Sequence, residues 1–405
     1  MTTSATDILI AKEKKYLAGN YKSLPVVLTR GQGVWVWDVD GNKYLDFLSA
    51  YSAVSGGHHN TRIINALNAQ LNKIDVPSRA FYTDILGSYA EKLCTFTGMD
   101  KMLPMNTGAE AVETAIKAAR RWGYRVKGIE KDKARIIVCD GNFHGRTTTI
   151  ISFSSDADYR ADFGPLTSGF DLIPFGDVAA LEAAITPDTC AFLVEPIQAE
   201  VGIKIPPKGW LRAVQAVCKK HNVLLILDEI QTGMARTGAN FCFQHEIDKP
   251  DGLTLGKALG GGIYPVSAFL ARQDVMDVFN PGSHGSTFGG NPIAAAIGLE
   301  AIAQMEDEKF SERSANLGEY LRNRLAAIQS PLIKEVRGMG LLVGLEIDST
   351  FANARTVCEN LMTHGLLCKE THETVVRFAP PLIISKEEID WAVEQVDSVL
   401  TEMSR

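Results

Sequence analysis

Two residues stand in settings that would change their chemistry. Asp228 directly follows the apolar run Val223–Leu227, and Lys257 lies among small and apolar residues between 255 and 262. A carboxylate at the end of a buried strand is costly unless a positive group meets it. A lysine in apolar surroundings can have a lowered pKa and act as an imine-forming amine. A strand-end Asp228 that caps a turn and a surface Lys257 in a glycine-rich loop remain the alternatives.

Two further segments could hold a phosphate. Residues 106–110 (Asn-Thr-Gly-Ala-Glu) have capping-box spacing and open a helix, and Gly108 and Ala109 would leave its first backbone amides accessible. Ser286 and Thr287 stand between glycines, which permits a close approach by a phosphate, although a simple turn is the alternative.

These features together match one ligand. Pyridoxal phosphate offers an aldehyde to a lysine, a pyridine nitrogen to an acid and a phosphate to backbone amides and hydroxyls. A nucleotide-binding P-loop is excluded because only three residues separate Gly252 from Gly256, and Ala258 follows the lysine. The sequence therefore predicts pyridoxal phosphate, with Lys257 on its aldehyde and Asp228 on its ring nitrogen.

The elements that must position these residues alternate between short apolar runs and helices. Strands are expected at 136–138, 191–194, 223–227 and 266–270, with helices at 177–185 and 209–221. This alternation predicts an α/β fold with a mainly parallel sheet covered by helices on both sides. Ligands of such sheets bind at the carboxyl ends of the strands, where Asp228 stands.

The pattern changes near both ends of the chain. An N-terminal hairpin is expected over 31–47, and the last 100 residues predict helices at 310–328, 354–364 and 388–403 with strands at 341–346 and 374–378. A capping box from Ser385 to Glu388 opens the last helix. We therefore expect three parts: an N-terminal segment, 1–50, that packs with a small domain; a large cofactor-binding domain, 51–305; and a C-terminal small α+β domain, 306–405.

Composition excludes several classes of protein. The 405 residues carry a net charge of −7, whereas a nucleic-acid-binding protein would present a basic face. No apolar run approaches the roughly 18 residues of a membrane helix. The seven cysteines are odd in number and form no C-x-x-C pair, which favours reduced thiols and a cytoplasmic protein. The adjacent His58 and His59 do not indicate a metal site, because no further metal-ligating residues lie at a suitable spacing from them.

Several motifs carry a resemblance that covers nearly the whole chain. Residues 225–233 with 236–238 and Lys257 resemble class III pyridoxal-phosphate aminotransferases. The motifs that are most similar to the ornithine-using branch of that family are 48–54, 78–82, 105–111, 195–198, 284–292 and 376–382. The resemblance implies fold-type I architecture and a homodimer with active sites at the subunit interface.

The resemblance also implies roles for residues around the cofactor. Lys257 would be the Schiff-base lysine and Asp228 the partner of the pyridine nitrogen. Gln231 would contact the ring hydroxyl and Phe143 would stack on the ring, although a core phenylalanine is the alternative. The phosphate would be held by Gly108 and Ala109, helped by Ser286 and Thr287 of the neighbouring subunit.

A second set of implied roles concerns substrate choice between ornithine and 2-oxoglutarate or glutamate. Arg146 would bind a substrate carboxylate in both half-reactions. Arg377 would be masked by Glu200 in the first half-reaction and freed in the second. Arginine suits both roles because its planar guanidinium binds carboxylates through two hydrogen bonds. Tyr21 and Tyr51 would meet the α-amino and α-carboxylate groups of ornithine. Without the family, Arg377 and Glu200 could equally be a strand-end surface charge and a solvated loop acid.

The implied reaction transfers the δ-amino group of ornithine to 2-oxoglutarate, giving glutamate-5-semialdehyde and glutamate in a ping-pong cycle. The alternatives are another ω-aminotransferase, acting on acetylornithine or γ-aminobutyrate, a pyridoxal-phosphate aminomutase, and a non-catalytic binding protein. Two departures from the family pattern occur, at 57–61 and at Leu17-Ala18, and the second lies beside Tyr21.

Overall fold

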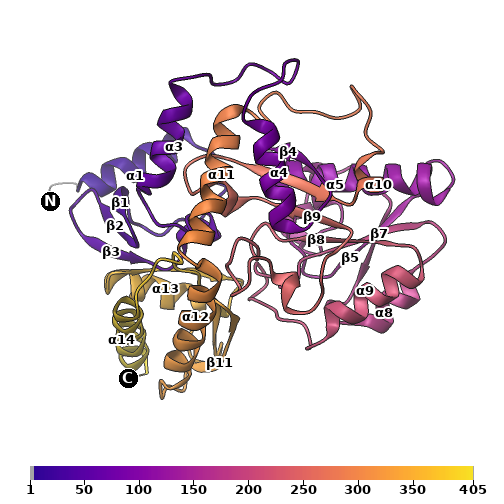
Figure 1. Ribbon diagram of the computed structural model, residues 1–405. Helices are drawn as coiled ribbons and strands as arrows, with labels where there is room; N and C mark the ends of the chain where they lie inside the picture. Colours follow the sequence, from indigo (N-terminus) through magenta and orange to yellow (C-terminus); the bar gives the residue numbers. More distant parts are fainter. Residues whose placement is uncertain (1–3, 405) are drawn as a thin grey trace.

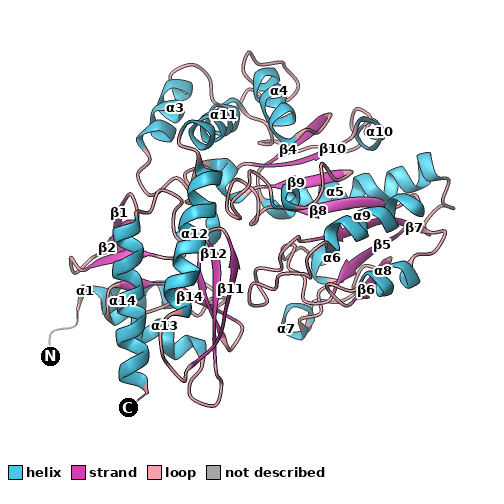
Figure 2. Ribbon diagram, turned by 60° about the horizontal axis from the view of Figure 1, so that its bottom comes forward, coloured by secondary structure: helices cyan, strands magenta, loops and turns pink. Residues whose placement is uncertain are grey.

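The computed structural model describes residues 4–404 and contains three sheets. The largest has seven strands in the order β4-β10-β9-β8-β7-β5-β6. Their bounds are β4 (Lys101–Met105), β10 (Ser267–Ala271), β9 (Gly252–Leu255), β8 (Leu224–Asp228), β7 (Thr189–Val194), β5 (Arg135–Cys139) and β6 (Phe170–Ile173). β10 runs antiparallel to both its neighbours, whereas the pairs from β9 to β6 are parallel. The expected mainly parallel sheet is confirmed (Figure 2).

Helices cover both faces of this sheet because its strands are apolar on both sides. In β8, Leu225 and Leu227 belong to one hydrophobic core with Trp210 and Val214 of α9 (Trp210–Lys220). Leu224 and Ile226 of the same strand belong to a second core with residues of α5 (Gly108–Trp122). Alternation of side chains along a strand thus divides the large part of the molecule into two cores.

The C-terminal part forms a smaller antiparallel sheet in the order β11-β12-β15-β14. Its strands are β11 (Ile333–Met339), β12 (Leu342–Ile347), β15 (Val375–Phe378) and β14 (Lys369–Thr371). The helices of this part are α12 (Phe310–Ala326), α13 (Ala354–Thr363) and α14 (Lys386–Met403). The capping box from Ser385 to Glu388 is present, but α14 begins at Lys386, earlier than expected, because the serine is the N-cap and the glutamate the third helical residue.

The N-terminal strands lie beside this C-terminal part (Figure 1). β1 (Leu28–Gln32), β2 (Trp35–Asp38) and β3 (Lys43–Asp46) form an antiparallel sheet, and β13 (Leu366–Leu367) joins β3 in parallel. The expected hairpin is therefore present, with its turn between β2 and β3. The division of the chain at residues 50 and 305 stays a prediction.

The remaining helices complete the layers around the sheets. They are α1 (Ala5–Tyr16), α2 (Ser49–Ser52), α3 (Thr61–Leu71), α4 (Leu86–Thr97), α6 (Thr148–Ile151), α7 (Ala157–Arg160), α8 (Val178–Ala184), α10 (Gln273–Met276) and α11 (Pro292–Asp307). Within residues 4–404, no helix has the length and apolar character needed to cross a membrane. All seven cysteines carry free thiols.

Candidate active site

Asp228 ends β8 and is held by three donors. Its Oδ1 accepts hydrogen bonds from Thr254 Oγ1 (3.1 Å) and from the Ile230 amide (3.1 Å), and its Oδ2 lies 2.6 Å from Nδ1 of buried His144. Burial by itself would lower the pKa of His144, but the hydrogen bond and charge of Asp228 raise it above its ordinary value. Asp228 therefore caps the turn after its strand and also forms a buried pair with an imidazole.

Lys257 lies just beyond β9, in a short 3₁₀ turn, and is partly buried. Its φ of 45° is a left-handed conformation that a side chain rarely adopts, so its place is fixed by the surrounding structure. Burial lowers the pKa of the Lys257 amine, while the carboxylates of Glu200 and Asp228 act in the opposite direction. Within residues 4–404 its Nζ makes no hydrogen bond or ion pair. The surface-lysine alternative does not fit this position.

The start of α5 is built to leave two amides accessible. Thr107 Oγ1 accepts from the Glu110 amide (3.3 Å), and Glu110 Oε2 accepts from the Thr107 amide (2.7 Å), so the capping box is present. Among the described residues, the amides of Gly108 and Ala109 have no hydrogen-bond partner, and the helix dipole favours an anion there.

A close contact sets this helix start beside Asp228. A Cβ added to Gly108 would lie 2.9 Å from Cδ1 of Ile230, two residues beyond Asp228. Glycine at 108 therefore permits the first turn of α5 to pack against the segment that follows β8. The amides of this turn and the carboxylate of Asp228 consequently belong to one site.

The second predicted phosphate segment lies at the same helix start. Ser286 Oγ accepts from Asn106 Nδ2 (2.8 Å) and from the Gly289 amide (3.0 Å), while Thr287 is exposed. These contacts are within one chain. That the hydroxyls of Ser286 and Thr287 serve a neighbouring subunit stays a prediction.

Phe143 and Gln231 lie near the Asp228 pair in different environments. The amide of Phe143 donates to Oε1 of Glu195 (2.9 Å), and its ring meets that of Tyr159 edge-on, with centroids 6.1 Å apart. Gln231 is buried, and its Nε2 has no hydrogen-bond partner among residues 4–404. A buried amide donor without a partner is uncommon and fits a ligand with a hydroxyl or phenolate oxygen at this point.

Glu195 is a buried acid that the sequence reasoning missed. Burial raises its pKa to about 8, and the neighbouring Asp228 and Glu200 carboxylates add to this, whereas His144 opposes it. A signal for Glu195 existed, because the apolar strand β7 leads straight into it, in the same pattern that identified Asp228. His144 was also missed, and its own surroundings in the sequence give no comparable signal.

Arg377 and Glu200 form the ion pair that the family resemblance implied. Arg377 Nη1 lies 2.6 Å from Glu200 Oε1, and the arginine side chain is 1% exposed. Burial raises the pKa of Glu200, but the charge and hydrogen bond of Arg377, with Lys257 and Arg146, outweigh burial and lower it. The surface-charge alternatives are therefore wrong for this pair, which lies close to the Lys257 amine.

Tyr51 lies over this ion pair on an unusual turn. The Arg377 guanidinium carbon is 4.7 Å from the centre of the Tyr51 ring. Residues 49–52, the short element α2, all have positive φ, between 44° and 75°, without a glycine among them, so α2 is a left-handed turn and not a right-handed helix. Asp46 Oδ1 holds its start by accepting from the amides of Leu48 (2.9 Å) and Ser49 (2.8 Å).

Tyr21 and Arg146 lie at the exposed side of this region. Tyr21 is 77% exposed, yet its hydroxyl is near enough to add to the pKa of Tyr51, which burial raises despite Arg377. The guanidinium of Arg146 is 4.1 Å from the ring centre of Tyr159 and is exposed. Every predicted site residue except Gln231 and Thr287 therefore has a described contact or electrostatic coupling with this region or with the start of α5.

The residues fit pyridoxal phosphate on three observations. Gln231 Nε2 is buried without a hydrogen-bond partner among the described residues. The Lys257 amine makes no hydrogen bond or ion pair there, and the amides of Gly108 and Ala109 are likewise without a partner. Asp228, Gln231 and Phe143 would hold the ring, and the amides of Gly108 and Ala109 would hold the phosphate. When bound, the cofactor supplies an electron sink for a carbanion.

The chain is similar to known aminotransferases over nearly its whole length. The family described as aminotransferase class-III matches residues 16–400. The ornithine aminotransferase of Geobacillus is 56% identical over 396 residues, which cover 98% of this chain and 99% of that protein.

Two solved structures share the fold. The ornithine aminotransferase of Toxoplasma gondii has a TM-score of 0.97 and 43% identity, with 99% of this chain and 96% of that chain covered. The acetylornithine aminotransferase of Elizabethkingia anophelis has a TM-score of 0.89 and 46% identity, covering 99% and 100%. The fold-type I architecture is thereby confirmed, and the chain belongs to the class-III aminotransferase family, as a pyridoxal-phosphate-dependent aminotransferase.

Proposed function

We propose that this enzyme transfers the δ-amino group of L-ornithine to 2-oxoglutarate, giving glutamate-5-semialdehyde and L-glutamate. The observation that carries the proposal is the buried ion pair of Arg377 with Glu200 (2.6 Å) under the ring of Tyr51. An arginine masked by an acid suits an enzyme that must accept a basic amino acid in one half-reaction and a dicarboxylate in the other.

The two half-reactions place different demands on this pair. While Glu200 covers Arg377, the local charge is balanced, so the α-ammonium of ornithine can lie beside it. A dicarboxylate needs an uncovered guanidinium, which binds a carboxylate through two parallel hydrogen bonds. Arg146 would hold the other carboxylate of 2-oxoglutarate, and Tyr21 and Tyr51 would contact the α-amino and α-carboxylate groups of ornithine.

Lys257 and Asp228 would serve the chemistry common to both halves. Lys257, whose pKa burial lowers, would hold the cofactor through its amine and then move a proton at the substrate carbon that carries the nitrogen. Asp228, fixed by His144 and Thr254, would keep a proton on the ring nitrogen.

Acetylornithine transamination is the second candidate, because an acetylornithine aminotransferase shares 46% identity with the chain. An acetylated α-nitrogen carries no positive charge and needs more room than the ammonium of ornithine. The Tyr51 ring, which packs on Arg377, favours the smaller and charged ornithine end.

We also propose that the active form is a homodimer. Phe81, Tyr82 and Phe288 are at least half exposed, and their two segments line one small cavity with Thr287. Large apolar side chains gathered on one surface favour association. In such a dimer, the exposed Thr287 would help to hold the partner's phosphate. The cytoplasmic location stays a prediction.

A half-reaction panel tests the proposal. The holoenzyme is mixed with ornithine, acetylornithine or γ-aminobutyrate in separate runs, and the loss of cofactor absorbance is followed together with the mass of the product. We expect ornithine to react with at least about tenfold higher kcat/KM than either alternative, which corresponds to about 1.4 kcal/mol. Faster reaction of acetylornithine or γ-aminobutyrate would assign the enzyme to the other branch. An isomerised amino acid without an aldehyde product would indicate an aminomutase.

A further inference from the structure

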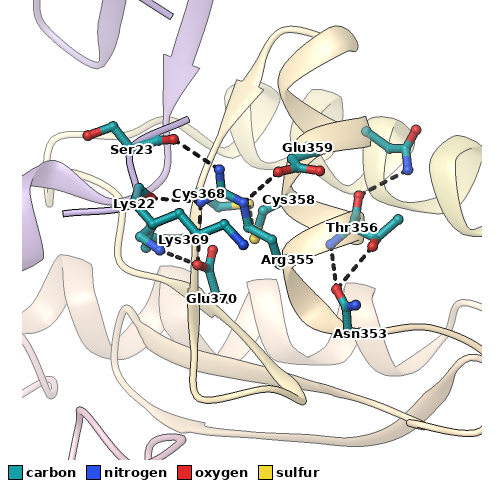
Figure 3. Close-up of polar contacts among 11 residues, drawn as sticks. Lys22, Ser23, Asn353, Arg355, Thr356, Cys358, Glu359, Cys368, Lys369 and Glu370 are labelled. Atoms are coloured by element: carbon teal, nitrogen blue, oxygen red, sulfur yellow. Dashed lines mark hydrogen bonds and ion pairs between the residues drawn. The ribbon is translucent and has the colours of Figure 1, made fainter. Parts of the chain in front are cut away.

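The segment that carries Tyr21 has little structure of its own. Residues 17–27 connect α1 to β1 without helix or strand, and residues 17–23 are exposed. Within residues 4–404, the only hydrogen bonds that join residues 18–23 to the rest of the protein come from one side chain, Arg355. Its Nη1 donates to the Lys22 carbonyl (2.9 Å) and its Nη2 to the Ser23 carbonyl (3.0 Å), as Figure 3 shows.

Arg355 is itself fixed by two acids. It lies in the first turn of α13, where Nε donates to Glu359 Oε1 (2.6 Å) and Nη1 lies 3.4 Å from Glu370 Oε1 (Figure 3). The side chain is 14% exposed. A guanidinium held on its Nε edge by a carboxylate presents its remaining donors in a rigid fork, which a lysine could not do.

Strand β14 links Arg355 to the substrate end of the active site. Glu370 lies on β14, and the next residue, Thr371, donates from its hydroxyl to the carbonyl of Glu200. On the paired strand, Arg377 lies opposite Lys369. The short strand β14 therefore contacts both Arg355, which binds the Tyr21 segment, and the ion pair of Glu200 with Arg377.

We propose that Arg355 is a positioning residue for the amino-acid substrate: it clamps the backbone at Lys22 and Ser23 and so holds Tyr21 beside Tyr51. This inference rests on the proposed function, which assigns Tyr21 to the α-carbon end of ornithine. In this proposal Arg355 does not contact the substrate, and it acts only by positioning Tyr21. A dicarboxylate, bound by the two arginines, would not depend on this clamp.

Steady-state kinetics test the selectivity of the clamp. In Arg355→Ala we expect the KM for ornithine to rise about tenfold, with kcat and the KM for 2-oxoglutarate changed by less than about twofold. Arg355→Lys keeps the charge without the fork and should recover only part of the loss. Arg324→Ala, which removes another small-domain ion pair, is the matched control and should leave both KM values unchanged.

Limited trypsin digestion tests the clamp without any turnover. Lys22 is exposed, and Arg355 holds the carbonyl of the bond that trypsin would cut. Cleavage after Lys22, measured by mass spectrometry relative to cleavage after Lys15, should be several-fold faster in Arg355→Ala than in wild type. The Arg324→Ala control should match wild type.

A double variant separates a clamp from general damage. If Arg355 acts through Tyr21, the KM for ornithine in Arg355→Ala/Tyr21→Ala should equal that of Tyr21→Ala alone, a non-additive result. Unchanged cleavage after Lys22, equal rises in both KM values, or full additivity would each overturn the inference. Wild-type enzyme that does not use ornithine would instead refute the proposed function, which the panel above reports separately.

Discussion

The two ends of the active site are built in different ways. At the cofactor end, Asp228 closes a buried strand and Gly108 and Ala109 open a capped helix, so regular elements fix the groups. At the substrate end, Tyr51 lies on a left-handed turn and Tyr21 on a segment without helix or strand, and long-range contacts fix both. Asp228 and the phosphate-binding amides thus lie at the ends of regular elements, with Lys257 just beyond β9, whereas the two tyrosines of the substrate end lie on irregular backbone that can vary independently.

The largest expected effect is at the cofactor end. Lys257→Ala should reduce turnover by at least about a thousandfold, because it removes both the amine that holds the cofactor and the proton carrier. Lys249→Ala, an exposed lysine before β9, is the control and should keep wild-type turnover. Single-turnover assays with ornithine measure both. Retained transamination in Lys257→Ala would contradict the role of Lys257 at the cofactor end.

At the substrate end, Glu200→Gln should uncover Arg377. The amide is a weaker mask than the carboxylate, so the kcat/KM for glutamate should rise relative to ornithine by about tenfold or more. Glu335→Gln alters an exposed acid of β11 that pairs with Arg337, and it is the matched control. Half-reaction rates with each amino acid give the ratio. An unchanged ratio would mean that Glu200 does not govern access to the guanidinium.

A smaller change is expected at Tyr51. Tyr51→Ile removes the ring that packs on Arg377 and should lower the preference for ornithine over γ-aminobutyrate by about tenfold or less. Tyr51→Phe keeps the ring and separates its contribution from that of the hydroxyl. Steady-state kinetics with both amines measure the preference, and a preference equal to wild type in Tyr51→Ile would remove the residue from substrate selection.

The smallest effect concerns the stability of the fold. The pKa of Glu195 is about 8 in the folded protein against an ordinary 4.5, so between these pH values the folded state binds the extra proton. Wild-type stability should therefore fall as pH rises through this window, and Glu195→Gln should lack that part of the decline. Urea titrations at pH 5.5 and 8 should show the variant gaining on the order of 1 kcal/mol relative to wild type. A difference independent of pH would contradict this.

The same contrast explains what could be predicted from sequence. The strand before Asp228 and the capping box at Thr107 depend only on residues close together in the sequence, so local sequence patterns predict them. The short strands β9 and β14 were not predicted: β9 begins at a glycine, and β14 has three residues whose pairing is decided by β15. Tertiary context decides such segments.

Sequence reasoning reached the substrate end only through family resemblance. Residues 49–52 contain no glycine, so their types do not predict a left-handed turn, and the contact of Tyr51 with Arg377 appears only in the folded chain. His144 and Arg355 were missed for the same reason, since each acts through a partner more than 80 residues away or across the molecule.

The most direct measurement is the site of covalent attachment of the cofactor. Borohydride reduces a carbon–nitrogen double bond between lysine and aldehyde to a stable amine, which peptide mass spectrometry can locate. Holoenzyme treated in this way should carry one reduced pyridoxyl phosphate per chain, on Lys257. A label on any other lysine, or a chain with bound cofactor that gains no covalent mass, would contradict the account.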